Sequence, residues 1–245
     1  MLRLLPSAAL LPAAALLIAT PIAAREPVNP PADVQLSGAV RVLSDYRDRG
    51  VSASDGKPAV QGEVAAEIQS GFYGGIAAST LPDSVPDGHY ELGFNAGWNG
   101  GIAPGLQANA GVLYNVFPGK AVSDYVERFA NTTYRFGPTR AKVGAIYAPA
   151  GQVALDGRDS NLQVFGSLAT AIPGTAISLD GRVGYNRGSL TFVSDFNRNE
   201  YYDWRLGASY ALGPVTLGVR YWDSDLPEVN DALRKTVAFR AEFGF

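Results

Sequence analysis

An alternation of side chains that runs to the last residue of the chain constrains the fold most strongly. Along the final segment, one set of alternate positions is apolar and the other is charged, polar or small. The first set is Val237, Phe239, Ala241, Phe243 and Phe245, and the second is Thr236, Ala238, Arg240, Glu242 and Gly244. Side chains of a β-strand point to opposite faces with a period of two, so this segment predicts a strand with one apolar and one charged face. An aromatic chain end on such a strand suits an outer-membrane barrel, where apolar side chains face lipid and polar ones face a lumen.

Similar segments recur along the chain and predict twelve strands. They cover residues 35–46, 59–68, 72–80, 90–99, 106–116, 125–136, 139–148, 162–172, 176–186, 201–212, 215–223 and 235–245. Most have about ten residues, the length that a tilted strand needs to cross a bilayer. We therefore expect an all-β fold, a transmembrane antiparallel up-and-down barrel of twelve strands, with ten or fourteen strands as the alternatives. Arg128 falls on the lipid-facing set, so we expect it near the outer rim, where a charge costs little.

The connections between these segments alternate in length. Short, turn-forming connections lie at 70–71, 100–104, 137–138, 173–175 and 213–214. Longer polar connections lie near 47–58, 81–89, 117–124, 149–161, 187–200 and 224–234. Outer-membrane barrels have short periplasmic turns and long external loops. Because the first and last strands begin and end on the side of the short turns, this alternation predicts that both termini are periplasmic.

The amino terminus reads as a secretory signal. Arg3 supplies a positive charge, residues 10–18 an apolar region, and residues 22–24 a small-residue cleavage site. We expect a cleaved signal peptide over 1–24, a periplasmic lead-in over 25–34 and the outer-membrane barrel over 35–245. A retained membrane anchor is the alternative for the first segment.

Composition excludes several classes of function. The chain has no cysteine, so disulfides, zinc thiolate sites and cysteine nucleophiles are impossible. Its net charge of −3 does not indicate the basic surface that nucleic-acid binding requires. The acid-rich stretches 156–159 and 223–225 do not match a full calcium-binding loop. We therefore expect no metal, no other cofactor and no nucleic-acid partner.

An enzymatic site is also not expected. His89 is the sole histidine, and it follows a segment that contains Ser79, Ser84, Asp83 and Asp87. A hydrolase on a barrel wall would need a nucleophile with a general base, most often histidine. Neither serine has a nucleophile-elbow pattern around it, so we expect an ordinary rim histidine and no catalytic residue.

The alternation assigns charged side chains to the lumen. We expect the pore to be lined by Arg41, Glu63, Glu67, Glu91, Arg140, Lys142, Arg182, Arg205, Arg220, Arg240 and Glu242. Together with Arg135, Glu127, Asp180 and Asp203 they make the lumen nearly neutral, which predicts weak ion selectivity. The charges are nevertheless segregated by strand, and such segregation can orient polar solutes in transit.

The first long loop resembles a known family. The residues that carry the resemblance are Ser44-Asp45-Tyr46-Arg47, Arg49-Gly50-Val51-Ser52, Gly56-Lys57-Pro58-Ala59-Val60-Gln61-Gly62 and Ser70-Gly71-Phe72-Tyr73-Gly74-Gly75. They resemble the opening of the TorF-like porins, a proteobacterial outer-membrane family also called Gcw_chp, of unknown function. The resemblance implies an outer-membrane barrel with a pore, and it brings no substrate and no catalytic residues. Asp48 departs from the family pattern, which has a large apolar residue at this position.

The charged residues of this loop form a candidate latch. Arg47 and Arg49 lie close in sequence to Asp45 and Asp55, and salt bridges among them would fold the loop inward and narrow the pore. Tyr46 is expected on the outer aromatic girdle. In the alternative, the arginines order an exposed loop or bind lipopolysaccharide phosphates as bidentate donors.

Two functional hypotheses follow. In the first, the chain is an outer-membrane porin of a Gram-negative bacterium, a narrow and weakly selective channel for passive diffusion of small hydrophilic solutes or ions. In the second, the lumen is plugged, and the long loops contact lipopolysaccharide or another partner. Twelve strands lie between small, filled barrels and large, open ones, so size alone does not decide. A barrel hydrolase and a soluble secreted sandwich are minor alternatives, and the oligomeric state stays open.

Overall fold

The computed structural model describes residues 34–83, 89–118, 124–152, 160–188 and 198–245. Within these ranges, twelve antiparallel strands form one closed barrel. Its strands are β1 (Val34–Leu43), β4 (Ala59–Ile68), β5 (Phe72–Thr80), β6 (Tyr90–Ala103), β7 (Leu106–Val116), β8 (Tyr125–Phe136), β9 (Thr139–Ala148), β10 (Asn161–Ala171), β11 (Ile177–Gly188), β12 (Glu200–Leu212), β13 (Val215–Ser224) and β14 (Thr236–Gly244). A separate hairpin of two-residue strands, β2 (Arg47–Asp48) and β3 (Val51–Ser52), lies in the loop after β1. The predicted fold class and strand number are confirmed.

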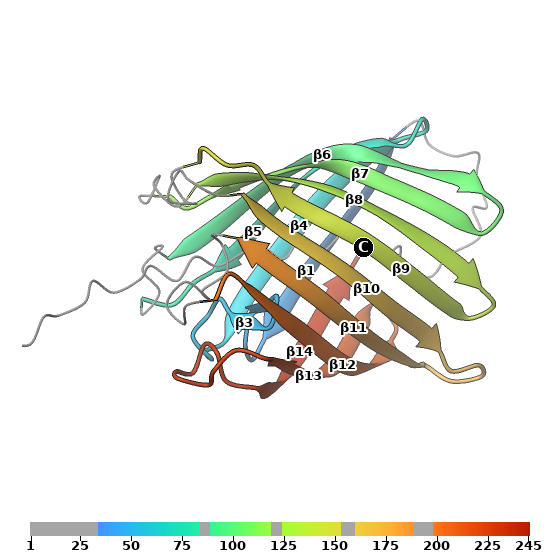
Figure 1. Ribbon diagram of the computed structural model, residues 1–245. Coiled ribbons are helices and arrows are strands. Elements are labelled where there is room, and N and C mark those ends of the chain that lie inside the picture. Colours follow the sequence, from blue (N-terminus) through green and yellow to red (C-terminus); the bar gives the residue numbers. More distant parts are fainter. Residues whose placement is uncertain (1–33, 84–88, 119–123, 153–159, 189–197) are drawn as a thin grey trace, which may run out of the picture.

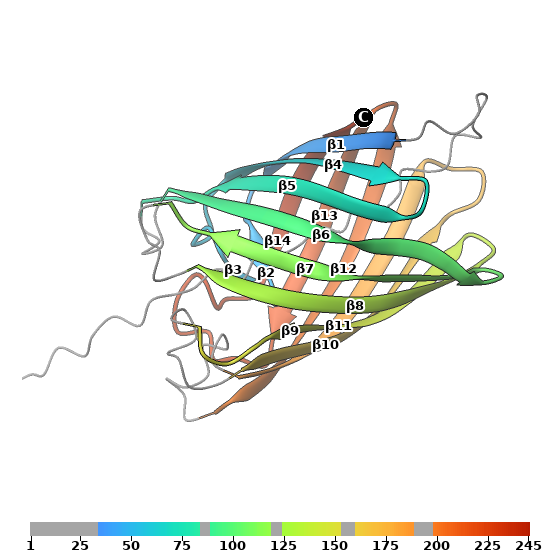
Figure 2. The same ribbon diagram turned by 90° about the horizontal axis from the view of Figure 1, so that it is seen from above.

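The barrel closes where the last strand pairs with the first. Ala39 on β1 is opposite Gly244 on β14, and the register continues to Leu43 opposite Arg240. Beyond the ladder, Gly38 and Phe245 exchange two backbone hydrogen bonds, each of 3.0 Å. Figure 2 shows the carboxyl end beside the start of β1. Because a closed sheet has no edge, each strand can pair along both sides.

The outer surface is apolar. Large hydrophobic side chains point outward from every strand of the barrel, and examples are Leu36 (71% exposed) on β1 and Leu206 (64% exposed) on β12. Inward positions between them hold buried polar residues such as Gln61 and Asn109. A continuous apolar exterior around a polar interior is typical of a barrel surrounded by lipid. No helix long and apolar enough to cross a membrane occurs in the part of the chain that the structure describes.

The short turns gather at one end of the barrel, and the two long loops that are described in full, residues 44–58 and 225–235, lie at the other (Figure 1). Two short turns have the sequence Gly-Pro, and Gly137 and Gly213 adopt φ values of 56° and 59°. A positive φ at the first central residue of a two-residue turn matches the twist of antiparallel strands, and glycine adopts it without strain. Phe245 and the start of β1 lie at this short-turn end. The expected signal peptide and nearly all of the lead-in lie outside the described residues.

The bounds of two strands, β1 and β6, differ clearly from the expected ones. β1 ends at Leu43, three residues before the expected end at Tyr46, because the chain then turns into the barrel. β6 continues to Ala103, beyond the expected end at Asn99, and has a register shift between Gly101 and Ala103.

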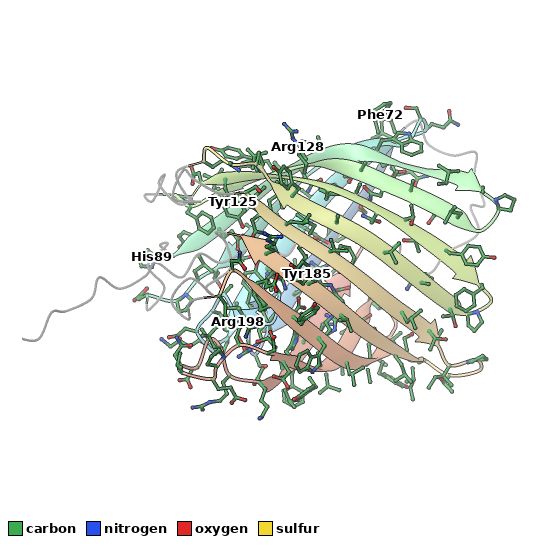
Figure 3. All side chains as sticks on the ribbon, in the orientation of Figure 1. Phe72, His89, Tyr125, Arg128, Tyr185 and Arg198 are labelled. Atoms are coloured by element: carbon green, nitrogen blue, oxygen red, sulfur yellow. The ribbon has the colours of Figure 1, made fainter. Side chains whose placement is uncertain are left out.

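Phe72 and Arg128 project from the outside of the barrel (Figure 3). Arg128 lies three residues after the start of β8, near the long-loop end, where it was expected.

A charge at the middle of the apolar surface tests its contact with lipid. We expect Leu206→Arg to lower the free energy of unfolding from lipid vesicles by about 2–4 kcal/mol, the cost of a cation near the bilayer midplane. Val229→Arg is the matched control, because Val229 is equally exposed (64%) but lies in the loop after β13. Denaturant titration measures both, and equal small effects would contradict a lipid-facing position for Leu206.

Candidate functional site

The first loop, residues 44–58, folds into the mouth of the barrel. Arg47 and Arg49 are 5% and 4% exposed, although both carry a charge and lie outside the barrel strands. Asp45 and Ser54 of the same loop are also buried. Close packing of this kind requires that each buried charge has a partner. The partners of these residues therefore show how the loop is held.

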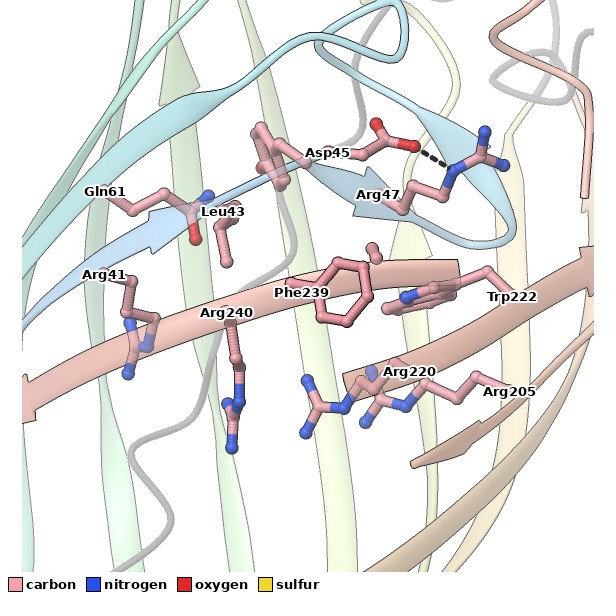
Figure 4. A pocket seen from close by; sticks show the side chains of 12 residues that line it. Arg41, Leu43, Asp45, Arg47, Gln61, Arg205, Arg220, Trp222, Phe239 and Arg240 are labelled. Carbon is pink, nitrogen blue, oxygen red and sulfur yellow. Dashed lines mark hydrogen bonds and ion pairs between the residues drawn. The ribbon is translucent and has the colours of Figure 1, made fainter. Parts of the chain in front are cut away.

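One set of partners lies within the loop. Arg47 donates to a carboxylate oxygen of Asp45, the contact drawn in Figure 4, and to the backbone oxygen of Gly50 at 3.0 Å. Ser52 donates to the other carboxylate oxygen of Asp45. These bonds give the loop a compact shape of its own.

A second set joins the first loop to the barrel wall. The guanidinium of Arg49 donates to Glu127 of β8 at 2.6 Å, and Glu127 is fully buried. The hydroxyl of Tyr201 on β12 donates to the backbone oxygen of Arg49 at 2.9 Å. Arg49 therefore bridges strands on two sides of the mouth. Its backbone has a φ of 51°, an uncommon value for a residue with a side chain.

The last loop, residues 225–235, packs on the first. Arg47 donates to the backbone oxygen of Asp231 at 3.2 Å, and the backbone N–H of Ser52 donates to Ala232 at 2.9 Å. An apolar cluster supports these bonds, and its buried members are Val51, Tyr201, Leu226, Ala232 and Leu233. The two loops therefore form one structural unit across the mouth.

Two residues of the first loop differ from expectation. Tyr46 does not face the outer girdle. It is 3% exposed, and its hydroxyl donates to Glu91 of β6 at 3.1 Å. The inward turn after Leu43 reverses its expected side, and the ring joins an apolar cluster with Phe117 and Tyr125. Asp55 takes no part in the Arg47 or Arg49 pairs, and its cationic neighbour is Lys57 at 3.9 Å.

A layer of polar side chains on β10, β11 and β12, which we call the amide layer, lies beside the inserted loop. Gln163 donates to Asn186 at 2.8 Å, and Asn186 donates to Asp203 at 2.8 Å. Arg182 donates to the same aspartate at 2.6 Å. All of these groups except Arg182 are fully buried or nearly so. Sequence reasoning missed this amide layer, and its only signal was the placement of Asn and Gln at inward positions near the long-loop ends of strands.

The lumen below the loop is lined by arginines. We call Arg41, Arg205, Arg220 and Arg240 the arginine cluster, and they lie on β1, β12, β13 and β14. Arg41 donates to Glu63 at 2.7 Å and to Glu242. Arg220 and Arg205 lie 3.3 Å and 3.7 Å from Asp180 of β11. With residues of the first loop, the cluster encloses a pocket of about 50 Å³, seen in Figure 4.

The expected pore-lining residues all occupy inward positions, but the structure does not gather them into one site. Glu63 and Glu242 join the arginine cluster through Arg41, while Arg182 belongs to the amide layer. Glu91 lies beside Tyr46. Glu67 and Arg140 lie elsewhere on the wall, and Lys142 lies outside the pocket but close enough to Arg205 for the two charges to repel. Arg140 and Lys142 have no carboxylate within ion-pair distance among the described residues.

The described residues place His89 beside one of the two aspartates that lie near it in the sequence. His89 is two-thirds exposed and lies 2.8 Å from Asp83, at the rim of the barrel labelled in Figure 3. Ser79 instead accepts a hydrogen bond from Gln61 inside the barrel. Ser84 and Asp87 lie outside the described residues, as does the acidic stretch 156–159. Among the described residues, no group of three or more potential metal ligands lies together.

The ionisation of Asp48 makes the stability of the inserted first loop depend on pH. Burial raises the pKa of Asp48 to about 6, although Arg49, 3.2 Å away, opposes the shift. Arg182 also lowers this pKa, while Glu127 and Asp203 raise it. For Arg49, burial alone would lower the pKa, but attraction by Glu127 and Asp48 raises it above its ordinary value. Asp48 therefore titrates closer to neutrality than an ordinary aspartate.

We expect acid to favour the inserted loop. Asp48 binds a proton more tightly in the inserted loop than in a released one, so insertion is most stable at low pH and loses this advantage as pH rises from about 4 to about 6. Conductance of the wild type in lipid bilayers, and cleavage of the loop by protease, should both be lower at about pH 4.5 than at about pH 7.5. Asp48→Asn mimics the neutral form, so both readouts should stay low at either pH. An unchanged response in this variant would assign the effect to other carboxylates.

Solved structures share this fold. The chain resembles the NanC porin with a TM-score of 0.57 and 10% identity, over 86% of this chain and 99% of that one. It resembles the KdgM porin with a TM-score of 0.58 and 7% identity, over 85% and 98% of the two chains. At these identities the likeness is one of fold alone. No curated protein matches the sequence.

The sequence itself matches one family model. The match covers residues 27–242, and the family is described as "Bacterial protein of unknown function (Gcw_chp)". The description contains no TorF-like designation, so that part of the expected relationship stays a prediction. Because the match spans nearly the whole barrel, the chain belongs to the Gcw_chp family of bacterial proteins.

Proposed function

We propose that this protein is an outer-membrane porin of a Gram-negative bacterium, with both termini periplasmic, and that it conducts small hydrophilic solutes by passive diffusion. The observation that carries the proposal is the contrast between the two halves of the lumen. Around the first loop, Glu127, Asn186 and Asp203 are fully buried. Below it, the side chains of Arg205, Asp180 and Glu242 are 20–24% exposed, so water reaches them. A hydrated polar path inside an apolar exterior is what passive diffusion needs.

The first loop would set the width of this path. It occupies the mouth and is tied to the wall by Arg49 and Glu127. A constriction there agrees with a narrow channel for small solutes. The near balance of lumen charges supports weak selectivity between ions. The likeness to the KdgM porin, which is also known in complex with disordered oligogalacturonate, supports passage of a hydrophilic solute through a barrel of this shape.

A plugged barrel is the second candidate, and the burial around the first loop favours it. If the loop and the amide layer seal the mouth, the long loops become the functional surface, with outer-membrane lipid and lipopolysaccharide as partners. The two candidates differ in one measurable property, because a sealed barrel conducts no ions. Single-channel recording from the refolded mature protein in a planar bilayer separates them.

Breaking the tie between the first loop and the wall should widen the channel. Arg49→Ala leaves Glu127 as a buried charge without its main partner, which destabilises the inserted loop by about 3–5 kcal/mol. Glu127→Gln removes the charge from the other side and should act in the same direction. We expect both variants to have a higher single-channel conductance than the wild type.

Lys57→Gln is the matched control, because it removes a cation from the same loop at a half-exposed position. Its conductance should equal that of the wild type. Discrete conductance steps in the wild type support the porin. If the folded, inserted wild type, Arg49→Ala and Glu127→Gln all conduct no ions, the porin is rejected and the plugged barrel is favoured.

A further inference from the structure

We propose that the arginine cluster is a binding site for an oxyanion group, and that the channel therefore prefers small anionic solutes such as carboxylates. This inference rests on the proposed function, since a solute must enter the lumen to reach the site. The site is the pocket beneath the first loop (Figure 4). The modest preference expected agrees with a lumen that is nearly neutral in sum.

The pocket has an excess of positive charge, although the charged side chains of the whole lumen nearly balance. Charged residues that line the pocket are the four arginines of the cluster and the pair formed by Arg47 and Asp45. The four arginines share three carboxylates among the described residues, namely Asp180, Glu63 and Glu242. Lys142 interacts with Arg205 by like-charge repulsion and adds to the excess. An anion in the pocket would relieve this repulsion.

Several donors of the cluster are not used by the protein. The Nε atoms of Arg205 and Arg240 are buried and have no hydrogen-bond partner. Nε of Arg205 is 3.7 Å from Asp180, too far for a hydrogen bond, whereas Arg240 donates to Glu242 through a terminal nitrogen at 3.4 Å. Neither Nε atom is accessible to a solute, so an oxyanion would bind the terminal nitrogens of these guanidinium groups. The guanidinium of Arg205 also lies over the ring of Trp222 at 5.0 Å, which orients its plane.

Glycines on the wall leave space for the arginines to lie flat. A Cβ atom on Gly207 of β12 would lie 2.8 Å from Cγ of Arg220, and one on Gly218 of β13 would lie 2.8 Å from Nε of Arg240. Arg220 and Arg240 therefore each cross a neighbouring strand at a glycine, where no side chain blocks them. The stems of Arg220 and Arg240 therefore lie against the wall.

The size and chemistry of the pocket indicate the kind of ligand. A volume of about 50 Å³ admits one oxyanion group, and the rest of the solute would extend along the lumen. Guanidinium groups bind carboxylate and phosphate in a bidentate manner, which a neutral hydroxyl cannot match. Carboxylate and phosphate solutes share this chemistry, and the test below separates them.

The first test measures ion preference by reversal potential in a potassium chloride gradient across a planar bilayer. We expect the wild type to prefer chloride by about twofold or more, and the double variant R220Q/R240Q to lose the preference. Arg128→Gln is the matched control, because it removes the same charge from the outer face, and it should leave the preference unchanged. A wild type without chloride preference, or a double variant that retains it, would overturn the inference while leaving the porin intact.

The second test measures block of the chloride current by acetate, inorganic phosphate and glucose. Oxyanions should block and glucose should not, and the stronger of the two blockers identifies the preferred group. Arg220→Lys keeps the charge but not the planar fork, so it should retain chloride preference and weaken oxyanion block by about tenfold. Equal block by glucose would contradict an anion site. Absence of any channel current from folded, inserted protein would instead reject the proposed function, and the inference with it.

Discussion

Complete pairing of the backbone is the constraint from which this architecture follows. Lipid offers no hydrogen bonds, so every strand inside a bilayer needs a neighbour on both edges. The chain meets this requirement by pairing β14 with β1, and the mutual bonds of Gly38 and Phe245 extend the seam to the last residue. Once the sheet is closed, the alternation of side chains sends one set to the lipid and the other to the lumen.

The polar set then has to be satisfied inside a confined space. Near the mouth, the first loop supplies some of the partners, since Arg49 donates to Glu127 and its backbone oxygen accepts a bond from Tyr201. Deeper in the lumen, the arginine cluster shares too few carboxylates for full pairing. The two regions thus differ physically: the side chains around the first loop are closely packed, whereas Arg205, Arg220 and Arg240 of the arginine cluster are partly exposed. The proposed constriction and the proposed anion site correspond to these two regions.

Much of the fold was predictable, because lipid imposes a strict period on every strand and turn chemistry is local. The alternation that recurs along the chain as far as Phe245, together with short turns such as Gly-Pro at 137–138 and 213–214, predicted the twelve strands. Tyr46 was placed wrongly for a related reason. Its expected side assumed that β1 continued, but the chain leaves the strand at Leu43, and the period then no longer applies.

The sequence by itself determined the closed barrel, the direction of each strand's side chains and the polarity of the lumen, since these depend on periods of two and on short turns. The tertiary structure alone decided which charges meet. Arg49 pairs with a residue 78 positions away, and Arg41 with one 201 positions away. Such contacts depend on the register around the whole barrel and on the path of a loop through its mouth. Neither quantity is encoded in the spacing of residues within one strand.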